Sequence, residues 1–306
     1  MGRRLQEMLG YWFMKALSWI LCHSPKFLVK LIADGIGFLA WQVTPAWRKR
    51  MAIVNIKECL GVETPRAEII AHASVKRFGR MLTEVLRFPV LDKTFLQEHI
   101  EVEGREFLEA AYQQKKGVIL CTGHFGNWEL LGMSVALMGY PLLSIARKQN
   151  NSAMDNFINE YRSLGGQQIV YNRGESSMLT ISRVLRDKKM LGVLYDQDTA
   201  DDSMELEFFG KKTKVPLGAA FFSRLHGAPI VPFFLHNNGE DKFVLRIYPP
   251  LYAEKTKDRA TDLQKPMKEL MLILEHEIIK NPSMWFWLHD RWKDGKRRFR
   301  DTESEG

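Results

Sequence analysis

Hydrophobic and polar positions follow two different periods along this chain of 306 residues. Residues 1–60 read as helices, and over 65–88 apolar side chains recur every three or four positions, as in an amphipathic helix. Beyond Pro89, short apolar runs alternate with helical stretches. This alternation predicts an α/β fold with a mostly parallel central sheet flanked by helices, behind a helical amino-terminal region.

The boundaries of the predicted elements follow from the same pattern. Strands are predicted at Val118–Cys121, Leu142–Ala146, Gln168–Tyr171, Met190–Tyr195, Ile230–Leu235 and Phe243–Ile247. Helices are predicted over 127–138, 152–163, 176–187 and 217–226, and a last helix is expected to open near Pro266 and end near Lys280. We expect three regions, namely a helical region over 1–98, an α/β domain over 99–295 and a polar tail, first basic and then acidic, over 296–306.

Two apolar segments of the helical region are candidates for contact with a membrane. Residues 8–22 contain Lys15, and residues 27–43 contain Lys30 and Asp34. A spanning helix needs about 20 mostly apolar residues, so these segments are better suited to lying in the bilayer interface. Four tryptophans fit such an interface: Trp12, Trp19, Trp41 and Trp47. The alternative is a pair of ordinary core helices. No small-residue cleavage site follows, so we expect no cleaved signal peptide.

The charge balance of the chain indicates a negatively charged binding partner. A net charge of +8 and a pI near 9.3 suit nucleic acid, anionic lipid or an acidic carrier protein. In the amino-terminal region the basic residues are interleaved with large apolar ones, which favours a lipid surface over nucleic acid. The chain has three cysteines, Cys22, Cys59 and Cys121. They lack the spacing of metal ligands and do not form an even set of disulfide partners, which fits a reducing cytoplasm. Cys121 is expected in the core.

The residues most suggestive of chemistry are Gly123–Glu129, between the strand at 118–121 and the helix at 127–138. They place His124 in a glycine-flanked turn at the carboxyl end of a strand, where ligands bind in open α/β sheets. On one helix, positions five apart point about 140° away from each other. His124 and Glu129 would not meet easily on one helix, but they can meet if His124 lies in the turn and Asn127 caps a helix whose first turn holds Glu129.

A histidine held by a carboxylate is a common device for taking a proton from a hydroxyl group. Backbone N–H groups near Asn127 and Trp128 would point out of the helix start and could stabilise developing negative charge. The alternative is a loop histidine that is merely packed. Asp196 and Asp198 follow the strand at 190–195, and their side chains could lie near His124, because parallel strands end at the same sheet edge. One of them could orient the imidazole. Alternatively, Asp196 and Asp198 belong to a solvated acidic loop or to a magnesium site. We expect no metal.

His124-x4-Glu129 resembles the H-x4-D/E motif of glycerolipid acyltransferases, and its surroundings are most similar to the bacterial lipid A late acyltransferase family. The resemblance covers roughly residues 100–295, and it extends over blocks in the same order as in the family: Ile145–Arg147 with Tyr161–Arg162, Leu194–Asp198, Phe208–Gly210 with Val215–Ala220, and Pro282–Lys293. The block at 208–210 could also be a β-hairpin with an exposed basic turn.

The resemblance implies acyl transfer from an acyl carrier protein to a hydroxyl of a lipid A precursor, at the cytoplasmic face of the bacterial inner membrane. It implies a His–Glu general-base mechanism without a cofactor. His124, Glu129 and Asp196 are the candidate catalytic residues, and Arg147, Arg162, Asn127 and Asp198 are the candidate substrate-binding residues. The alternatives are an acyl-CoA donor, another glycolipid or a lysophospholipid as acceptor, and a non-enzymatic basic protein that binds membrane or nucleic acid.

Overall fold

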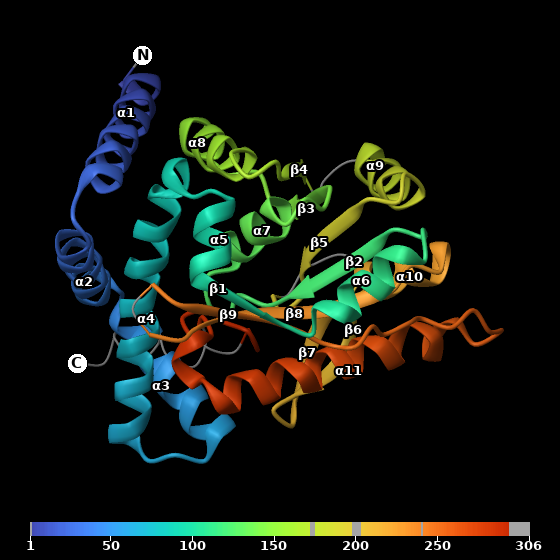
Figure 1. Ribbon diagram of the computed structural model, residues 1–306. Coiled ribbons are helices and arrows are strands. Elements are labelled where there is room, and N and C mark those ends of the chain that lie inside the picture. The colour runs from blue at the N-terminus through green and yellow to red at the C-terminus, as the bar shows by residue number, and fades with distance from the viewer. Residues whose placement is uncertain (1, 172–174, 198–202, 240, 294–306) are drawn as a thin grey trace.

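Four helices form the amino-terminal region of the protein. The computed structural model describes residues 2–171, 175–197, 203–239 and 241–293 (Figure 1). Helices α1 (Gly2–His23), α2 (Lys26–Val43), α3 (Ala46–Leu60) and α4 (Thr64–Leu86) come first. Pro25 and Pro45 stand at the N-cap positions of α2 and α3. Proline cannot continue the preceding helix, so the chain breaks at these two points.

None of the described helices is long and apolar enough to cross a membrane alone. By length and composition, α2 and α3 meet the criterion only as a pair, and they are bent by 102° relative to each other.

Helices and strands then alternate in the body of the protein. In chain order they are η1 (Phe88–Val90), α5 (Lys93–His99), β1 (Ile100–Glu103), α6 (Arg105–Gln113), β2 (Val118–Thr122), α7 (Trp128–Leu137), β3 (Leu142–Ala146), α8 (Ser152–Ser163), β4 (Gln168–Tyr171), α9 (Glu175–Arg186), β5 (Met190–Leu194), β6 (Ser203–Phe208), β7 (Lys211–Pro216), α10 (Gly218–His226), β8 (Ile230–Asn237), β9 (Phe243–Ile247), α11 (Arg259–Lys280) and η2 (Pro282–Met284).

The central sheet contains seven strands in the order β1-β9-β8-β2-β5-β3-β4. Strands β8, β2, β5, β3 and β4 are parallel, and β9 is antiparallel to β8. The prediction of a mostly parallel sheet flanked by helices is confirmed. Strands β2 and β5 are neighbours in the sheet although β3 and β4 lie between them in sequence, and this pairing positions the candidate site.

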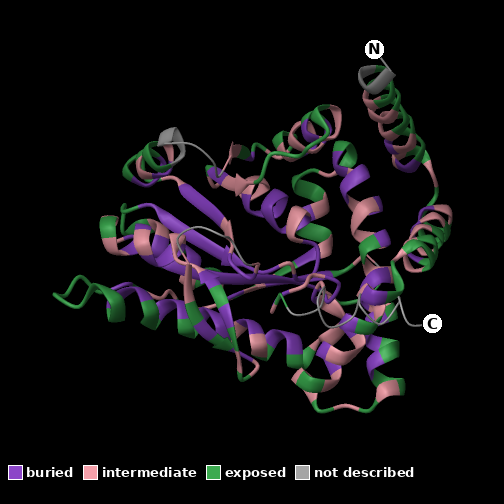
Figure 2. Ribbon diagram, turned by 180° about the vertical axis from the view of Figure 1, so that it is seen from behind, coloured by how far each residue is buried: buried purple, intermediate pink, exposed green. Residues whose placement is uncertain are grey.

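Each face of the sheet packs against its own layer of helices. In β2, Val118 and Leu120 belong to one buried cluster, together with residues of α6, α7 and α8. Ile119 and Cys121 belong to the other, together with residues of α9, α10 and α11. Side chains of a strand point alternately to its two faces, so β2 has water on neither side. Figure 2 shows the central strands as almost entirely buried.

Residues 208–210 belong to a β-hairpin, which was one of the two interpretations of this block. Strands β6 and β7 pair antiparallel, and their turn is formed by Phe209 and Gly210, which have φ angles of 52° and 68°. Two positive φ angles in succession are typical of the turn that suits the twist of a two-residue hairpin. Sequence analysis did not predict α5, β1 or α6.

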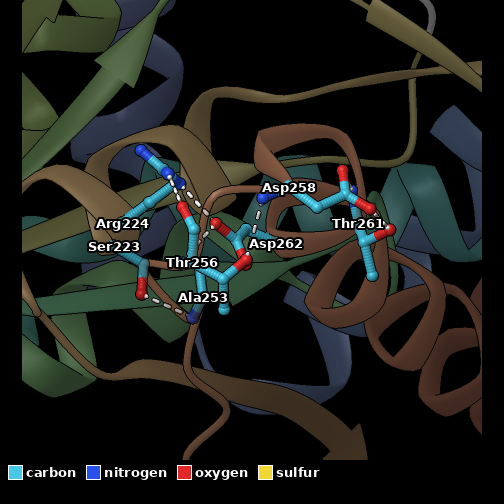
Figure 3. A network of polar contacts seen from close by, with 7 residues as sticks. All are labelled: Ser223, Arg224, Ala253, Thr256, Asp258, Thr261 and Asp262. Atoms are coloured by element: carbon cyan, nitrogen blue, oxygen red, sulfur yellow. Dashed lines mark hydrogen bonds and ion pairs between the residues drawn. The ribbon is translucent and has the colours of Figure 1, made fainter.

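The start of α11 differs from the prediction. The helix begins at Arg259 rather than near Pro266, because Asp258 caps it and accepts a hydrogen bond from the Thr261 N–H at 3.2 Å. Figure 3 shows the surrounding network, in which the buried Asp262 accepts from Arg224 Nε at 2.8 Å and from Thr256 Oγ1 at 2.7 Å. These contacts tie the first turn of α11 to α10. Pro266 therefore lies inside the helix, where it removes one backbone donor.

Candidate active site

The turn between β2 and α7 is constrained at both ends. Asn127 caps α7, as predicted, and its Oδ1 accepts a hydrogen bond from the Leu130 N–H at 2.9 Å. Gly126 has a φ of +65°, and a Cβ atom there would lie 2.1 Å from the carbonyl oxygen of Leu235. Only glycine fits this position without moving the backbone. The turn thus holds His124 at the carboxyl end of the sheet.

The register of two neighbouring strands brings His124 to Asp196. Thr122 of β2 is paired with Leu194 of β5, and each site residue lies two positions further along its own strand. The Nδ1–H of His124 donates to Oδ1 of Asp196 at 2.7 Å, and the His124 backbone N–H donates to Oδ2 at 2.8 Å. The indole N–H of Trp285 also donates to Oδ2, at 2.8 Å. The Asp196 side chain is 1% exposed and that of His124 is 19% exposed. The carboxylate is therefore fixed, whereas the ring remains accessible.

The surroundings of Asp196 keep it ionised. Burial by itself raises the pKa of Asp196, but the charge of His124 and hydrogen bonds from His124 and Trp285 outweigh burial and lower the pKa to about 2. Hydrogen bonds to the charged form of an acid favour that form. An ionised Asp196 requires the proton of a neutral His124 to reside on Nδ1, which leaves the Nε2 lone pair available.

Glu129 lies in the first turn of α7, as predicted, but its carboxylate does not hold His124. Both of its oxygens accept from Arg162 of α8, from Nε at 2.7 Å and from Nη2 at 2.5 Å. The expected His124–Glu129 pairing is corrected here, since Asp196 is the carboxylate on the imidazole. The physical reason is that Arg162 matches both carboxylate oxygens in a bidentate fork. Glu129 and Arg162 instead line a cavity of about 40 Å³, together with Trp128 and Ser144.

The structure does not bring together all the candidate substrate-binding residues. Asn127 is 3% exposed, and its Nδ2 donates to Glu84 of α4 at 2.6 Å, so its side chain supports the turn. Arg147 is exposed just beyond β3. It does not line the cavity at Glu129 or a second, smaller hollow next to His124. Asp198 lies outside the described residues.

Three residues at the site were not identified from the sequence as functional. A small hollow of about 10 Å³ at His124 is lined by Arg77 and Phe78 of α4 and by Trp285. The helical pattern of 65–88 predicts α4 but not which of its faces turns toward the sheet edge. Trp285 belongs to a run of large apolar residues that reads as core, and its indole N–H is the only sign of a polar role.

The buried cysteine and the possible metal site are the remaining candidate features. Cys121 is buried in β2, as predicted, and burial raises the pKa of its thiol. Within the described residues no group of three or more His, Cys, Asp or Glu side chains is arranged to hold a metal ion.

Known proteins that are similar to this chain are acyltransferases. The family model described as bacterial lipid A biosynthesis acyltransferase matches residues 2–294. The chain is 25% identical over 286 residues to phosphatidylinositol mannoside acyltransferase of Mycobacterium tuberculosis, covering 90% of this chain and 87% of the relative. It is 23% identical over 289 residues to lipid A biosynthesis palmitoleoyltransferase of Escherichia coli, covering 92% and 90%. The resemblance drawn from the His124 motif is confirmed: the chain belongs to the bacterial lipid A biosynthesis acyltransferase family.

Proposed function

We propose that this acyltransferase moves a fatty acyl chain from an acyl thioester to a hydroxyl group of a membrane glycolipid, with His124 as the general base. The observation that carries the proposal is the hydrogen bond from His124 Nδ1 to the ionised Asp196 at the carboxyl edge of the sheet. This bond directs the free lone pair of Nε2 toward the substrate side. Asp196 also stabilises the imidazolium that forms when the hydroxyl loses its proton.

The reaction needs no covalent enzyme intermediate. The hydroxyl oxygen, deprotonated by Nε2 of His124, attacks the thioester carbonyl carbon, and a C–O bond forms. When the tetrahedral intermediate collapses, the C–S bond breaks and the leaving thiolate takes the proton back from Nε2. Backbone N–H groups at the start of α7 favour the oxyanion. Arg77 lines the hollow at His124 and adds positive charge there.

Glu129 and Arg162 are proposed to position substrate rather than to move a proton. Their bidentate pair fixes the guanidinium of Arg162 at the wall of the cavity beside the site. A guanidinium held in this way can orient a phosphate or a carbonyl oxygen.

A lipid A precursor is the acceptor that we propose, with acyl carrier protein as the donor. The net charge of +8 suits an acidic carrier protein as the donor. A mannosylated phosphoinositide is the second candidate acceptor, because the relative from Mycobacterium tuberculosis has that activity in its name and is 25% identical. The two acceptors differ in mass, so their products can be told apart.

We further propose that the protein lies on the cytoplasmic face of the bacterial inner membrane. Helices α1 and α2 expose large apolar side chains to solvent, among them Trp12 at 61%, Phe13 at 66% and Phe27 at 69%. Exposed apolar residues next to lysines are typical of helices in the bilayer interface.

Mass spectrometry of membrane lipids from cells with and without the protein tests the proposal. Wild-type protein should add one acyl chain to a glycolipid, and His124→Ala should abolish this product. His276→Ala removes an exposed histidine of α11 and should leave the product unchanged. Purified protein supplied with acyl carrier protein or CoA thioesters then identifies the donor. Near-normal product from the His124→Ala variant would refute the general-base role.

A further inference from the structure

One face of α4 turns toward the candidate active site. Ser74 and Arg77 of α4 are three positions apart, so they share one face of the helix, and both line the hollow at His124. Ser74 Oγ donates a hydrogen bond to the carbonyl oxygen of Trp285 at 2.6 Å. Trp285 in turn donates to Asp196. Arg77 therefore lies one helical turn from a direct contact with the residues that hold His124.

A second contact fixes α4 on the other side of Arg77. Seven positions beyond Arg77, Glu84 accepts a hydrogen bond from Nδ2 of Asn127, the residue that caps α7, at 2.6 Å. Ser74 and Glu84 thus bracket Arg77 and hold it at the turn between β2 and α7. A Cβ atom added to Gly126 in that turn would lie 3.5 Å from Nη2 of Arg77. The guanidinium therefore lies beside the backbone of this turn.

The Arg77 guanidinium keeps its hydrogen-bond donors available to a ligand. Within the described residues it forms no hydrogen bond or ion pair, and its nitrogen atoms reach solvent. Burial and, to a smaller extent, the charge of Arg80 lower the pKa of Arg77, and together they outweigh the charge of Glu84, which raises it. A partly buried cation without a close counter-ion is unfavourable, and an anionic ligand would remove that cost.

The other arginine near the site differs in this respect. Arg162 donates to both carboxylate oxygens of Glu129, so its charge is compensated and its fork is filled. A phosphate would compete with Glu129 for Arg162, but among the described residues it meets no such competitor at Arg77. A guanidinium binds two oxygens of a phosphate at once, in the same geometry as a carboxylate. Arg77 is therefore the better placed of the two arginines to receive a phosphate.

The surroundings of Arg77 suit an amphiphilic ligand. Phe78 is 38% exposed, its ring centroid lies 5.9 Å from that of Phe286, and both rings line the hollow. Met81 and Met284 add further apolar surface there. Because the hollow itself is only about 10 Å³ in volume, a phosphate would lie at its mouth in contact with Arg77. Apolar parts of the same ligand would then contact the surrounding side chains.

We propose that Arg77 binds a phosphate of the acceptor lipid and thereby places a hydroxyl group of that lipid at Nε2 of His124. The proposal rests on the function proposed above, and it narrows the acceptor to a phosphorylated lipid. Both candidate acceptors, a lipid A precursor and a mannosylated phosphoinositide, carry phosphate. A donor thioester on a phosphopantetheine arm carries phosphate too. The apolar side chains around Arg77 suit a membrane lipid better than the polar arm of a water-soluble carrier protein.

Equilibrium binding to lipids in detergent micelles, without an acyl donor, tests this role of Arg77 apart from acyl transfer. The probes are a bisphosphorylated lipid A precursor and the same lipid after phosphatase treatment. The wild-type protein should bind the phosphorylated lipid about tenfold or more tightly than the treated one, because charge-assisted contacts to phosphate are strong. Arg77→Gln should bind both lipids equally weakly. The absence of a preference in the wild type, or a preserved preference in Arg77→Gln, would overturn the proposal.

Matched variants separate phosphate binding by Arg77 from general charge and from folding. Arg80→Gln removes the same charge about one turn further along α4, where the side chain pairs with Asp34 outside the hollow, and should keep the preference. Arg77→Lys retains the charge but not the planar fork and should keep a reduced preference, which serves the test if Arg77→Gln is poorly folded. A loss in Arg80→Gln equal to that in Arg77→Gln would mean that overall charge, and not Arg77, binds the lipid.

The donor and the general-base role are tested separately. The relative affinities for S-acyl phosphopantetheine and S-acyl pantetheine should be unchanged in Arg77→Gln, and a loss confined to the phosphorylated donor would overturn the proposal. His124→Ala should bind both lipids as the wild type does, because Arg77 remains in place. If Arg77→Gln loses the preference while His124→Ala still forms product, only the general-base role fails. If Arg77→Gln keeps the preference while His124→Ala forms no product, only the phosphate site fails.

Discussion

At the scale of single residues, the candidate site depends on one carboxylate that receives three hydrogen bonds. Asp196 accepts from the ring and the backbone of His124 and from Trp285. Each donor favours the ionised acid, and together they outweigh the cost of burying it. Asp196 thereby determines both the orientation and the tautomer of the histidine.

Replacement of Asp196 by asparagine should therefore remove catalysis while preserving the shape of the site. The amide can no longer select the Nδ1–H tautomer, and it cannot stabilise the imidazolium. We expect kcat to fall by about 10²–10⁴-fold with little change in KM. Steady-state kinetics with a thioester donor would measure both constants. Trp285→Phe removes one donor without changing the tautomer and should cause a smaller loss, and a variant Asp196→Asn with nearly normal kcat would contradict this role.

The depressed pKa of Asp196 also predicts how stability depends on pH. The pKa is about 2 in the folded protein, below its ordinary value of 3.8, so the unfolded chain takes up the proton first as pH falls. The stabilisation is complete above about pH 4 and is lost as pH falls toward 2, and it amounts to about 2 kcal/mol. Urea unfolding between pH 2 and 6 should show this loss in the wild type. A variant Asp196→Asn with an equally steep dependence would rule it out.

At the scale of elements, the sequence predicted the strand–helix order from β2 to β5 and from α10 to α11, because these runs are set off from one another by their hydrophobic pattern. The predicted bounds of β3, α8, β4 and β9 match the structure. The choice between Glu129 and Asp196 as partner of His124 could not be made from spacing. It depends on the pairing of β2 with β5 and on Arg162 reaching Glu129 from α8, and both are long-range contacts. Arg77 was missed for the same reason.

The contact between α2 and α4 offers a test with an internal control. A Cβ on Gly37 would lie 2.8 Å from the backbone of Lys76, whereas a Cβ on Gly35 would meet nothing within 4 Å. Gly35→Ala should raise stability by about 0.5–1 kcal/mol, because alanine favours a helix. Gly37→Ala should instead loosen α2, since backbone must move to admit the methyl group.

Hydrogen exchange of α2 amides would measure the difference between these two variants. Faster exchange should be confined to α2 and the facing part of α4 in Gly37→Ala, while the sheet remains protected. Equal exchange in the two alanine variants would mean that the close approach of the helices is not needed.

At the scale of the whole molecule, positive charge and exposed apolar surface occur together at the amino-terminal end. The sheet and its helices form two buried apolar clusters, whereas α1 and α2 carry many of the large apolar side chains that are exposed to solvent. A protein with contiguous exposed apolar residues usually covers them with a partner or a membrane. Charge brings such a protein to an anionic surface, and apolar contact then holds it there.

This division of roles predicts two separable effects on vesicle binding. Trp12→Ser/Phe13→Ser should strongly reduce co-sedimentation with phosphatidylglycerol vesicles at both low and high salt, because it removes the insertion of apolar side chains. Raised salt alone should weaken the vesicle binding of the wild-type protein only in part, because salt screens the charge attraction but not the apolar contact. Leu272→Ser/Ile279→Ser removes two exposed apolar residues of α11, which are 48% and 57% exposed, and should leave binding unchanged. An equal loss in both double variants would mean that general surface hydrophobicity, and not α1, holds the protein to the bilayer.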